Sequence, residues 1–166
     1  MHRFCTLTMT AMALLIGVAL HAGDALAQTA KDLAGTWQWV SVDTTAPDGK
    51  KAQPFGPTPQ GFIVFDSNGR FAYLLSRPGR AKFAAKNREQ GTPDENKETV
   101  QGSLAFSGTY SVSDKTLIFK IEASTYPNSE GTEQKRSITL TADELKWTIP
   151  ATTTGATSEV VLKRVK

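Results

Sequence analysis

Apolar and polar positions alternate with a period of two along most of the chain after residue 34. Turn sequences separate the alternating segments, among them Pro47-Asp48-Gly49 and Asp66-Ser67-Asn68-Gly69, in which Asn-Gly tolerates positive φ at low cost. Alternation of this kind places every second side chain on one face, so each segment predicts a strand with one buried face. The predicted strands cover residues 35–43, 61–65, 71–76, 104–112, 116–123, 134–141, 145–149 and 159–165.

One stretch in the middle of the chain departs from this pattern. Thr92, Pro93 and Glu95 form an N-cap, a first-turn proline and a capping-box acid, and they predict a helix over residues 93–103. Strands in consecutive order with mostly hairpin connections favour an up-and-down barrel, and eight of them enclose room for side chains or one small ligand. The expected fold is therefore all-β: an eight-stranded antiparallel up-and-down barrel with one short helix.

The first 27 residues have the features of a secretory signal. Arg3 gives a positive start, an apolar run covers residues 12–20, and Ala25-Leu26-Ala27 places small residues two apart. The apolar run is shorter than the roughly 20 residues that a membrane-spanning helix needs. We therefore expect residues 1–27 to be a cleaved signal peptide. Residues 28–166 would then be one domain, periplasmic or secreted, without a membrane anchor after cleavage.

Cleavage would change the chemistry that is available. His2, His21 and Cys5 lie in the predicted signal, so the remaining chain has no imidazole and no thiol. This excludes Ser-His-Asp and Cys-His nucleophiles, histidine-held haem or zinc, and disulfides. No carboxylates have ligand spacing, so we expect neither a metal nor a cofactor. The net charge of +3 is modest and scattered, and nucleic-acid binding is not expected.

Several motifs point to a known family. Gly35-Thr36-Trp37 resembles the Gly-x-Trp signature of lipocalins and related calycin barrels, and Arg164 matches the arginine that packs over that tryptophan in such folds. Further blocks, in the same order along the chain, are similar to the bacterial and fungal lipocalin-like domain family: residues 33–42, 54–57, 77–80, 91–93 and 126–128. The resemblance implies a lipocalin-like β-barrel domain over residues 28–166. It also implies that Gly35, Trp37 and Arg164 close the barrel.

The same resemblance implies no catalytic residue here. Members of the family often carry histidine on the strand where this chain has Phe119. That departure puts any transfer of catalytic function in doubt.

Strand periodicity also predicts which side chains face the barrel interior, the lumen. On the strand 134–141, Ile138 and Leu140 share a face with Gln134 and Arg136. An inward arginine must find a carboxylate, a carbonyl, water or a ligand anion, because an unpaired buried charge costs several kcal/mol. Two interpretations stay open: Arg136 reaches solvent or an internal partner at the barrel mouth, or it anchors an anionic ligand through paired hydrogen bonds.

The other strands supply mainly aromatic side chains to the predicted lumen. Phe106 is expected inside, and so are Ser41, two residues after Trp39 on the first strand, and Ala123, at the end of the fifth. The candidate ligand-binding residues are Arg136, Gln134, Tyr110, Trp39, Trp147, Phe119 and Tyr73. This lumen suits an apolar ligand with a polar head, and equally a barrel filled by its own side chains.

Three classes of function remain open. The leading hypothesis is an exported protein that binds a small apolar or amphipathic molecule, with an acidic or polar end, in the lumen. The second is an isomerase or cyclase that uses the lumen as a dry active site, with Tyr, Asp, Glu or Lys for proton transfer. The third is a protein-interaction barrel with a filled core. A basic run follows the third strand, either as a solvated loop or as a pocket rim: Arg77, Arg80, Lys82, Lys86 and Arg88.

Overall fold

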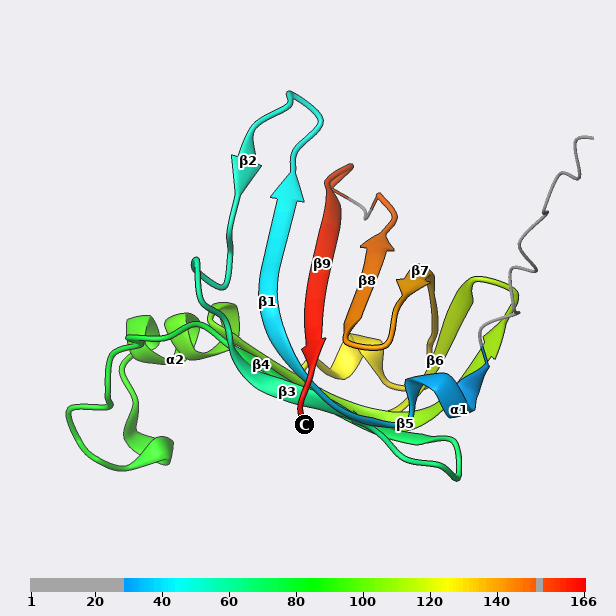
Figure 1. Ribbon diagram of the computed structural model, residues 1–166. Coiled ribbons are helices and arrows are strands. Elements are labelled where there is room, and N and C mark those ends of the chain that lie inside the picture. The colour runs from blue at the N-terminus through cyan, green and yellow to red at the C-terminus, as the bar shows by residue number, and fades with distance from the viewer. Residues whose placement is uncertain (1–28, 152–153) are drawn as a thin grey trace, which may run out of the picture.

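The computed structural model describes residues 29–151 and 154–166, and the predicted signal peptide lies outside this part of the chain. Nine strands form one antiparallel sheet that curves around a common interior (Figure 1). Their bounds are β1 Gly35–Thr45, β2 Lys51–Ala52, β3 Gln60–Phe65, β4 Arg70–Ser76, β5 Ser103–Ser113, β6 Thr116–Ser124, β7 Glu133–Leu140, β8 Glu144–Ile149 and β9 Thr157–Arg164.

The sheet closes on itself through β1. This strand pairs with β3, where Trp37 lies opposite Ile63, and also with β9, where Trp37 lies opposite Arg164. Eight strands in chain order therefore form a closed barrel, as the sequence predicts. The extra strand, β2, pairs only with Thr44 and Thr45 at the far end of β1.

The predicted helix is present as α2, Pro93–Gln101. Its capping box is complete: the Thr92 hydroxyl accepts from the Glu95 amide at 3.3 Å, and the Glu95 carboxylate accepts from the Thr92 amide at 2.8 Å. The helix ends at Gln101, two residues earlier than predicted, and Gly102 is its C-cap. A second helix, α1 Ala30–Leu33, was not predicted, because four residues are too few to show a helical period. Two short 3-10 helices lie at Arg88–Gln90 and Pro127–Ser129.

Two β-bulges shift the inward pattern away from the predicted one. The register of β1 against β9 slips between Trp39 and Ser41, so Val42 rather than Ser41 is buried. The register of β5 against β6 slips between Ser107 and Gly108, and Ala123 is exposed. The inward predictions for Ser41 and Ala123 are therefore wrong, because each bulge inserts one residue into an otherwise strict alternation.

The two ends of the barrel carry connections of different length. At one end lie α1 and the tight turns at residues 66–69, 114–115 and 141–143; we call this the closed end. At the other lie the longer connections 46–59, 77–102 and 125–132; we call this the mouth. Helix α2 projects on the mouth side (Figure 1). Among the described residues, no helix has the length and apolar character needed to cross a membrane.

Candidate functional site

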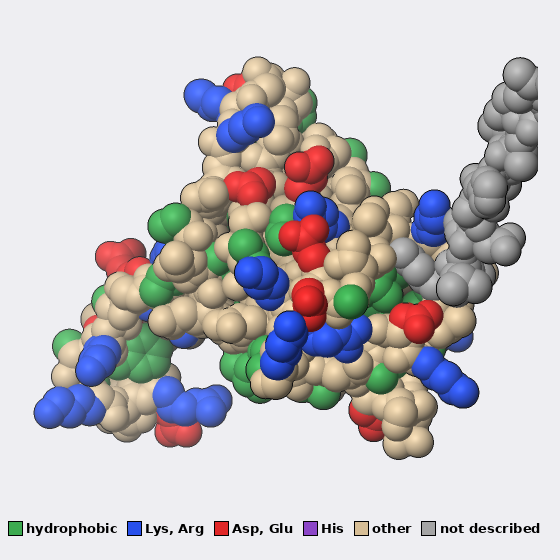
Figure 2. All heavy atoms as spheres, viewed as in Figure 1, with side chains coloured by type: hydrophobic (Ala, Val, Ile, Leu, Met, Phe, Trp, Pro, Cys, Tyr) green, Lys and Arg blue, Asp and Glu red, His purple; other side chains and the backbone are tan. Residues whose placement is uncertain are grey.

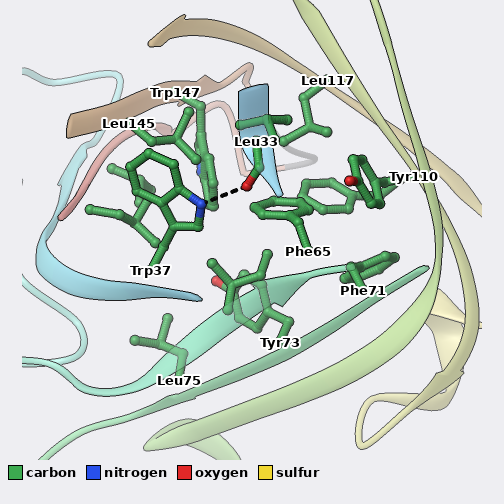
Figure 3. Packing of buried hydrophobic residues seen from close by; sticks show 14 of the residues in the cluster. Leu33, Trp37, Phe65, Phe71, Tyr73, Leu75, Tyr110, Leu117, Leu145 and Trp147 are labelled. Atoms are coloured by element: carbon green, nitrogen blue, oxygen red, sulfur yellow. Dashed lines mark hydrogen bonds between the residues drawn. The ribbon is translucent and has the colours of Figure 1, made fainter. Parts of the chain in front are cut away.

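The closed end is sealed by Trp37, whose side chain is fully buried. Its indole N–H donates to the Leu33 carbonyl oxygen of α1 at 2.8 Å (Figure 3). The Arg164 guanidinium lies over the Trp37 ring, 4.1 Å from its centroid, in a cation–π contact. Gly35 has φ +126°, and a Cβ there would lie 3.1 Å from Nη1 of Arg164. A side chain at position 35 would therefore disturb this closure.

Arg164 has several carbonyl partners at this end. Its guanidinium donates to the carbonyl oxygens of Asp32 at 2.6 Å, Ala34 at 2.7 Å and Ala142 at 2.8 Å. These contacts tie the last strand to α1 and to the turn between β7 and β8. In this arrangement Arg164 packs over Trp37 next to Gly35, where β1 meets β9.

Tyr110, one of the candidate ligand-binding residues, also lies at the closed end. Its hydroxyl is 2.8 Å from the Asp66 carbonyl oxygen and 3.1 Å from the Ala30 carbonyl oxygen. Burial raises the pKa of Tyr110, with a further contribution from the nearby charge of Asp66, so the hydroxyl remains a neutral donor. This position ties α1 to the turn after β3, and we leave Tyr110 out of the proposed ligand site.

A closed ring of aromatic side chains encircles the middle of the lumen. Each neighbouring pair is in contact, with ring centroids 4.1 to 6.3 Å apart. We call this ring the aromatic belt; its members, in order around the barrel, are Trp39, Tyr73, Phe106, Phe119 and Trp147. Four of the five are candidate ligand-binding residues. Phe106 was predicted to face inward but not to belong to the site.

Arg136 and Gln134 are inward polar residues of β7, the strand between the β6 and β8 members of the belt. In the ladder between β6 and β7, Arg136 is opposite Leu117 and Gln134 is opposite Phe119. Paired residues share a face of the sheet, and Leu117 and Phe119 are almost completely buried. Arg136 and Gln134 therefore face the lumen, as predicted.

The partners of Arg136 are neutral. Its guanidinium donates to the Gln134 side-chain oxygen and, at 2.8 Å, to the Lys135 carbonyl oxygen. None of the ion pairs among the described residues involves Arg136. Burial lowers the pKa of Arg136, and nearby Tyr73 partly opposes that shift. The guanidinium is thus a partly desolvated cation with no carboxylate partner in the described part of the chain.

Two further donors of the belt have no acceptor among the described residues. Tyr73 is 8 % exposed and its hydroxyl makes no hydrogen bond there; Trp147 is 3 % exposed and its indole N–H is buried without a partner. The Trp39 indole, by contrast, donates to the Leu74 carbonyl oxygen at 2.7 Å. Burial strongly raises the pKa of Tyr73, partly offset by Arg136, so its hydroxyl stays protonated.

The lumen is consequently rich in donors and poor in acceptors. On the described strands, no inward position is an aspartate, a glutamate or a histidine. Gln134 offers a side-chain oxygen, and Arg136 already uses it. Such a site favours molecules that bring their own acceptors, and it lacks the carboxylate or imidazole that most often acts as a general base.

The basic run forms part of a lobe with α2 rather than part of the lumen wall. Arg77 pairs with Glu98 of α2 at 3.2 Å, and the Arg80 guanidinium donates to the Arg77 carbonyl oxygen at 3.1 Å. Lys82, Lys86 and Arg88 are exposed. Figure 2 shows Lys and Arg side chains on this lobe, while both charge signs mix over the barrel body. Most of the basic run is therefore solvated surface.

The fold and this site define a small closed antiparallel barrel with an inward-facing cation on β7. Residues 34–164 match the family model of the lipocalin-like domain, and the chain belongs to that family. The resemblance seen in the sequence is thereby confirmed. A solved structure of a lipocalin-like protein from Bacteroides uniformis is also similar, with 16 % identity and a TM-score of 0.44, covering 81 % of this chain and 99 % of that chain. No curated protein matches significantly.

Proposed function

We propose that this protein is an exported binding protein for a small amphipathic molecule, whose apolar body contacts the aromatic belt and whose acidic end binds Arg136. The observation that carries the proposal is the inward guanidinium of Arg136 with only neutral partners. Removing a charge from water is costly unless an opposite charge compensates. A ligand carboxylate supplies that charge and matches the planar guanidinium with two parallel hydrogen bonds.

The geometry leaves donors available for such a ligand. A guanidinium has five N–H groups, and the Gln134 and Lys135 oxygens accept from two of its nitrogens. The neighbouring Tyr73 hydroxyl is protonated and can add a neutral donor beside the charge. Below the mouth, the belt offers aromatic surface for the apolar body of the ligand.

A binding titration with a matched arginine control tests the proposal. The chain from residue 28 onward is purified, and a fluorescent fatty acid is titrated against the wild type, Arg136→Met and Arg70→Met. Arg70 is a surface arginine that pairs with Glu122 at 2.7 Å. We expect Arg136→Met to weaken binding roughly tenfold to a hundredfold, the value of a charge-assisted hydrogen bond, and Arg70→Met to leave it unchanged.

Native mass spectrometry of gently purified protein complements the titration, because a co-purified ligand adds a discrete mass. Negligible binding by the wild type, or equal binding by the wild type and Arg136→Met, would overturn the proposal.

Export is part of the proposal and rests on residues 1–27. Expression of the full chain in a Gram-negative host, followed by fractionation, tests it. We expect a periplasmic product whose first residue is Gln28. A cytoplasmic product that retains Met1 would contradict it.

An apolar patch on the outer wall favours a second candidate, a protein contact. Phe62 and Leu74 are 43 % and 42 % exposed and lie opposite each other in the ladder between β3 and β4, and Val40 is also exposed. Exposed apolar patches often mark contact surfaces. If this face associates with a protein partner or a second copy, sedimentation of the wild type should reveal a complex that Phe62→Gln dissolves; a monomer with no complex at high concentration would oppose it.

A further inference from the structure

The barrel treats its buried polar donors in two ways. Trp37, Trp39 and Tyr110 each donate to a backbone carbonyl oxygen at 2.7 to 2.8 Å. Trp147 is 3 % exposed, but its indole N–H has no hydrogen-bond partner among the described residues. A buried donor without an acceptor costs about 1–3 kcal/mol, so this donor needs a physical reason.

Aromatic rings surround this donor. Trp147 is on β8, and its ring centroid lies 5.9 Å from that of Trp39 and 6.1 Å from that of Phe119. These two rings approach Trp147 at interplanar angles of 84° and 78°. Aromatic faces are weak acceptors compared with a carbonyl or hydroxyl oxygen. The strongest partner for this indole N–H would therefore come from a bound molecule.

We propose that the ligand carries a second polar group: a neutral oxygen on its apolar body, accepting a hydrogen bond from the indole N–H of Trp147. The ligand class is then an oxygenated amphipathic acid, with a keto or hydroxyl group in addition to the carboxylate. This inference rests on the proposed function, because it assumes that the acid end is held by Arg136.

The strand register indicates where the second oxygen lies. Trp147 is opposite Ile138, two residues along β7 from Arg136 toward the closed end. Two residues of a strand span about 7 Å. The neutral oxygen should therefore lie about this distance from the carboxylate, deeper in the barrel.

The ligand set for the test differs only in that oxygen. A saturated straight-chain fatty acid is compared with acids of the same length that carry one keto group at successive positions. Each acid is measured by displacement of a fluorescent fatty acid. We expect one keto position to bind wild-type protein roughly twofold to tenfold tighter than the plain acid, the value of one net hydrogen bond.

A conservative variant identifies the donor. Trp147→Phe removes the indole N–H and keeps an aromatic ring, and it should lower the preference for the keto acid over the plain acid. Tyr110→Phe is the matched control, because its hydroxyl already has carbonyl partners at the closed end. It should keep the full preference.

The outcomes separate this inference from the proposed function. If the plain acid binds in an Arg136-dependent way but no keto position binds tighter, the proposed function stands and the second polar contact is overturned. The second polar contact is likewise overturned if the preference survives in Trp147→Phe. If no acid binds, or if Arg136→Met binds as well as wild type, both ideas fail together. A preference lost equally in Tyr110→Phe would also overturn the assignment, because the effect would then be a general loss of packing.

Discussion

The two ends of the barrel use the same residue types for different purposes. At the closed end, Trp37, Tyr110 and Arg164 all donate to carbonyl oxygens. Toward the mouth, the Trp147 indole N–H has no partner among the described residues, and the partners of Arg136 there are neutral. Residue type and burial therefore do not distinguish structure from function in this lumen. The distinguishing property is whether the fold itself supplies each donor with an acceptor.

The two inward arginines show this most directly. Arg164 lies over Trp37 and binds three backbone carbonyl oxygens. Arg136 faces the lumen beside Tyr73, and burial lowers its pKa. Backbone carbonyl oxygens compensate the charge of Arg164, and we propose that a bound ligand compensates the charge of Arg136. Substitutions at paired positions turn this contrast into measurements.

The largest effect is expected at Trp37. Trp37→Ala removes a fully buried ring, its hydrogen bond to Leu33 and the surface on which Arg164 stacks. We expect the free energy of unfolding to fall by about 3–5 kcal/mol in urea denaturation. Val100→Ala, at an exposed position on α2, should change it by less than about 0.5 kcal/mol. A Trp37→Ala protein as stable as wild type would show that α1 does not seal the barrel.

The arginine pair should give opposite results in the same assay. Arg164→Met leaves the carbonyl oxygens of Ala34 and its neighbours without their donor, and we expect a loss of about 2 kcal/mol. Arg136→Met replaces a partly buried, uncompensated charge by an apolar side chain, and stability should be unchanged or higher. A large loss in Arg136→Met would mean that the guanidinium is structural, and the contrast between the two ends would fail.

A smaller effect is expected for the two tyrosines. Tyr110→Phe removes a hydroxyl whose partners are the carbonyl oxygens of Asp66 and Ala30, and it should cost about 1 kcal/mol. Tyr73→Phe removes a hydroxyl that has no partner among the described residues, and it should leave the free energy of unfolding unchanged or raise it. Chemical denaturation of both variants compares the two positions. Equal losses would show that the Tyr73 hydroxyl has a partner within the fold.

Of this contrast, the sequence predicted the inward residues but not their hydrogen-bond partners. Alternation of apolar and polar positions correctly placed Arg136 and Trp147 inside, because the strands around them are regular. It failed at Ser41 and Ala123, because a bulge depends on the register of a partner strand that is distant in sequence. Alternation predicts which side chains of a strand face inward. The pairing of the strands then determines which of these side chains lie beside one another.

The site membership of Tyr110 and Phe106 illustrates the same limit. Tyr110 faces inward as predicted, but α1, which holds its hydroxyl, is too short to be seen in the sequence. Phe106 was also predicted inward, yet its place in the aromatic belt follows from contacts with Tyr73 and Phe119 on two other strands. Hydrogen-bond partners and ring contacts are properties of the assembled barrel. A single strand does not contain them.

The smallest expected effect is a change of stability with pH. The Asp66 carboxylate accepts from the Arg70 and Asn68 amides in the turn at the closed end, and these hydrogen bonds hold the pKa of Asp66 below its usual range. A carboxyl whose folded-state pKa is lowered stabilises the fold above its unfolded-state pKa, about 3.9, and loses that contribution as pH falls through the folded-state value. Asp66→Asn should therefore be slightly less stable than wild type at neutral pH, and the difference should shrink toward zero in acid. Tyr110→Phe alters the same end without changing a carboxyl, so its difference from wild type should stay constant over that range. A difference for Asp66→Asn that does not change between neutral and acid pH would show that the carboxylate charge contributes nothing to the closed end.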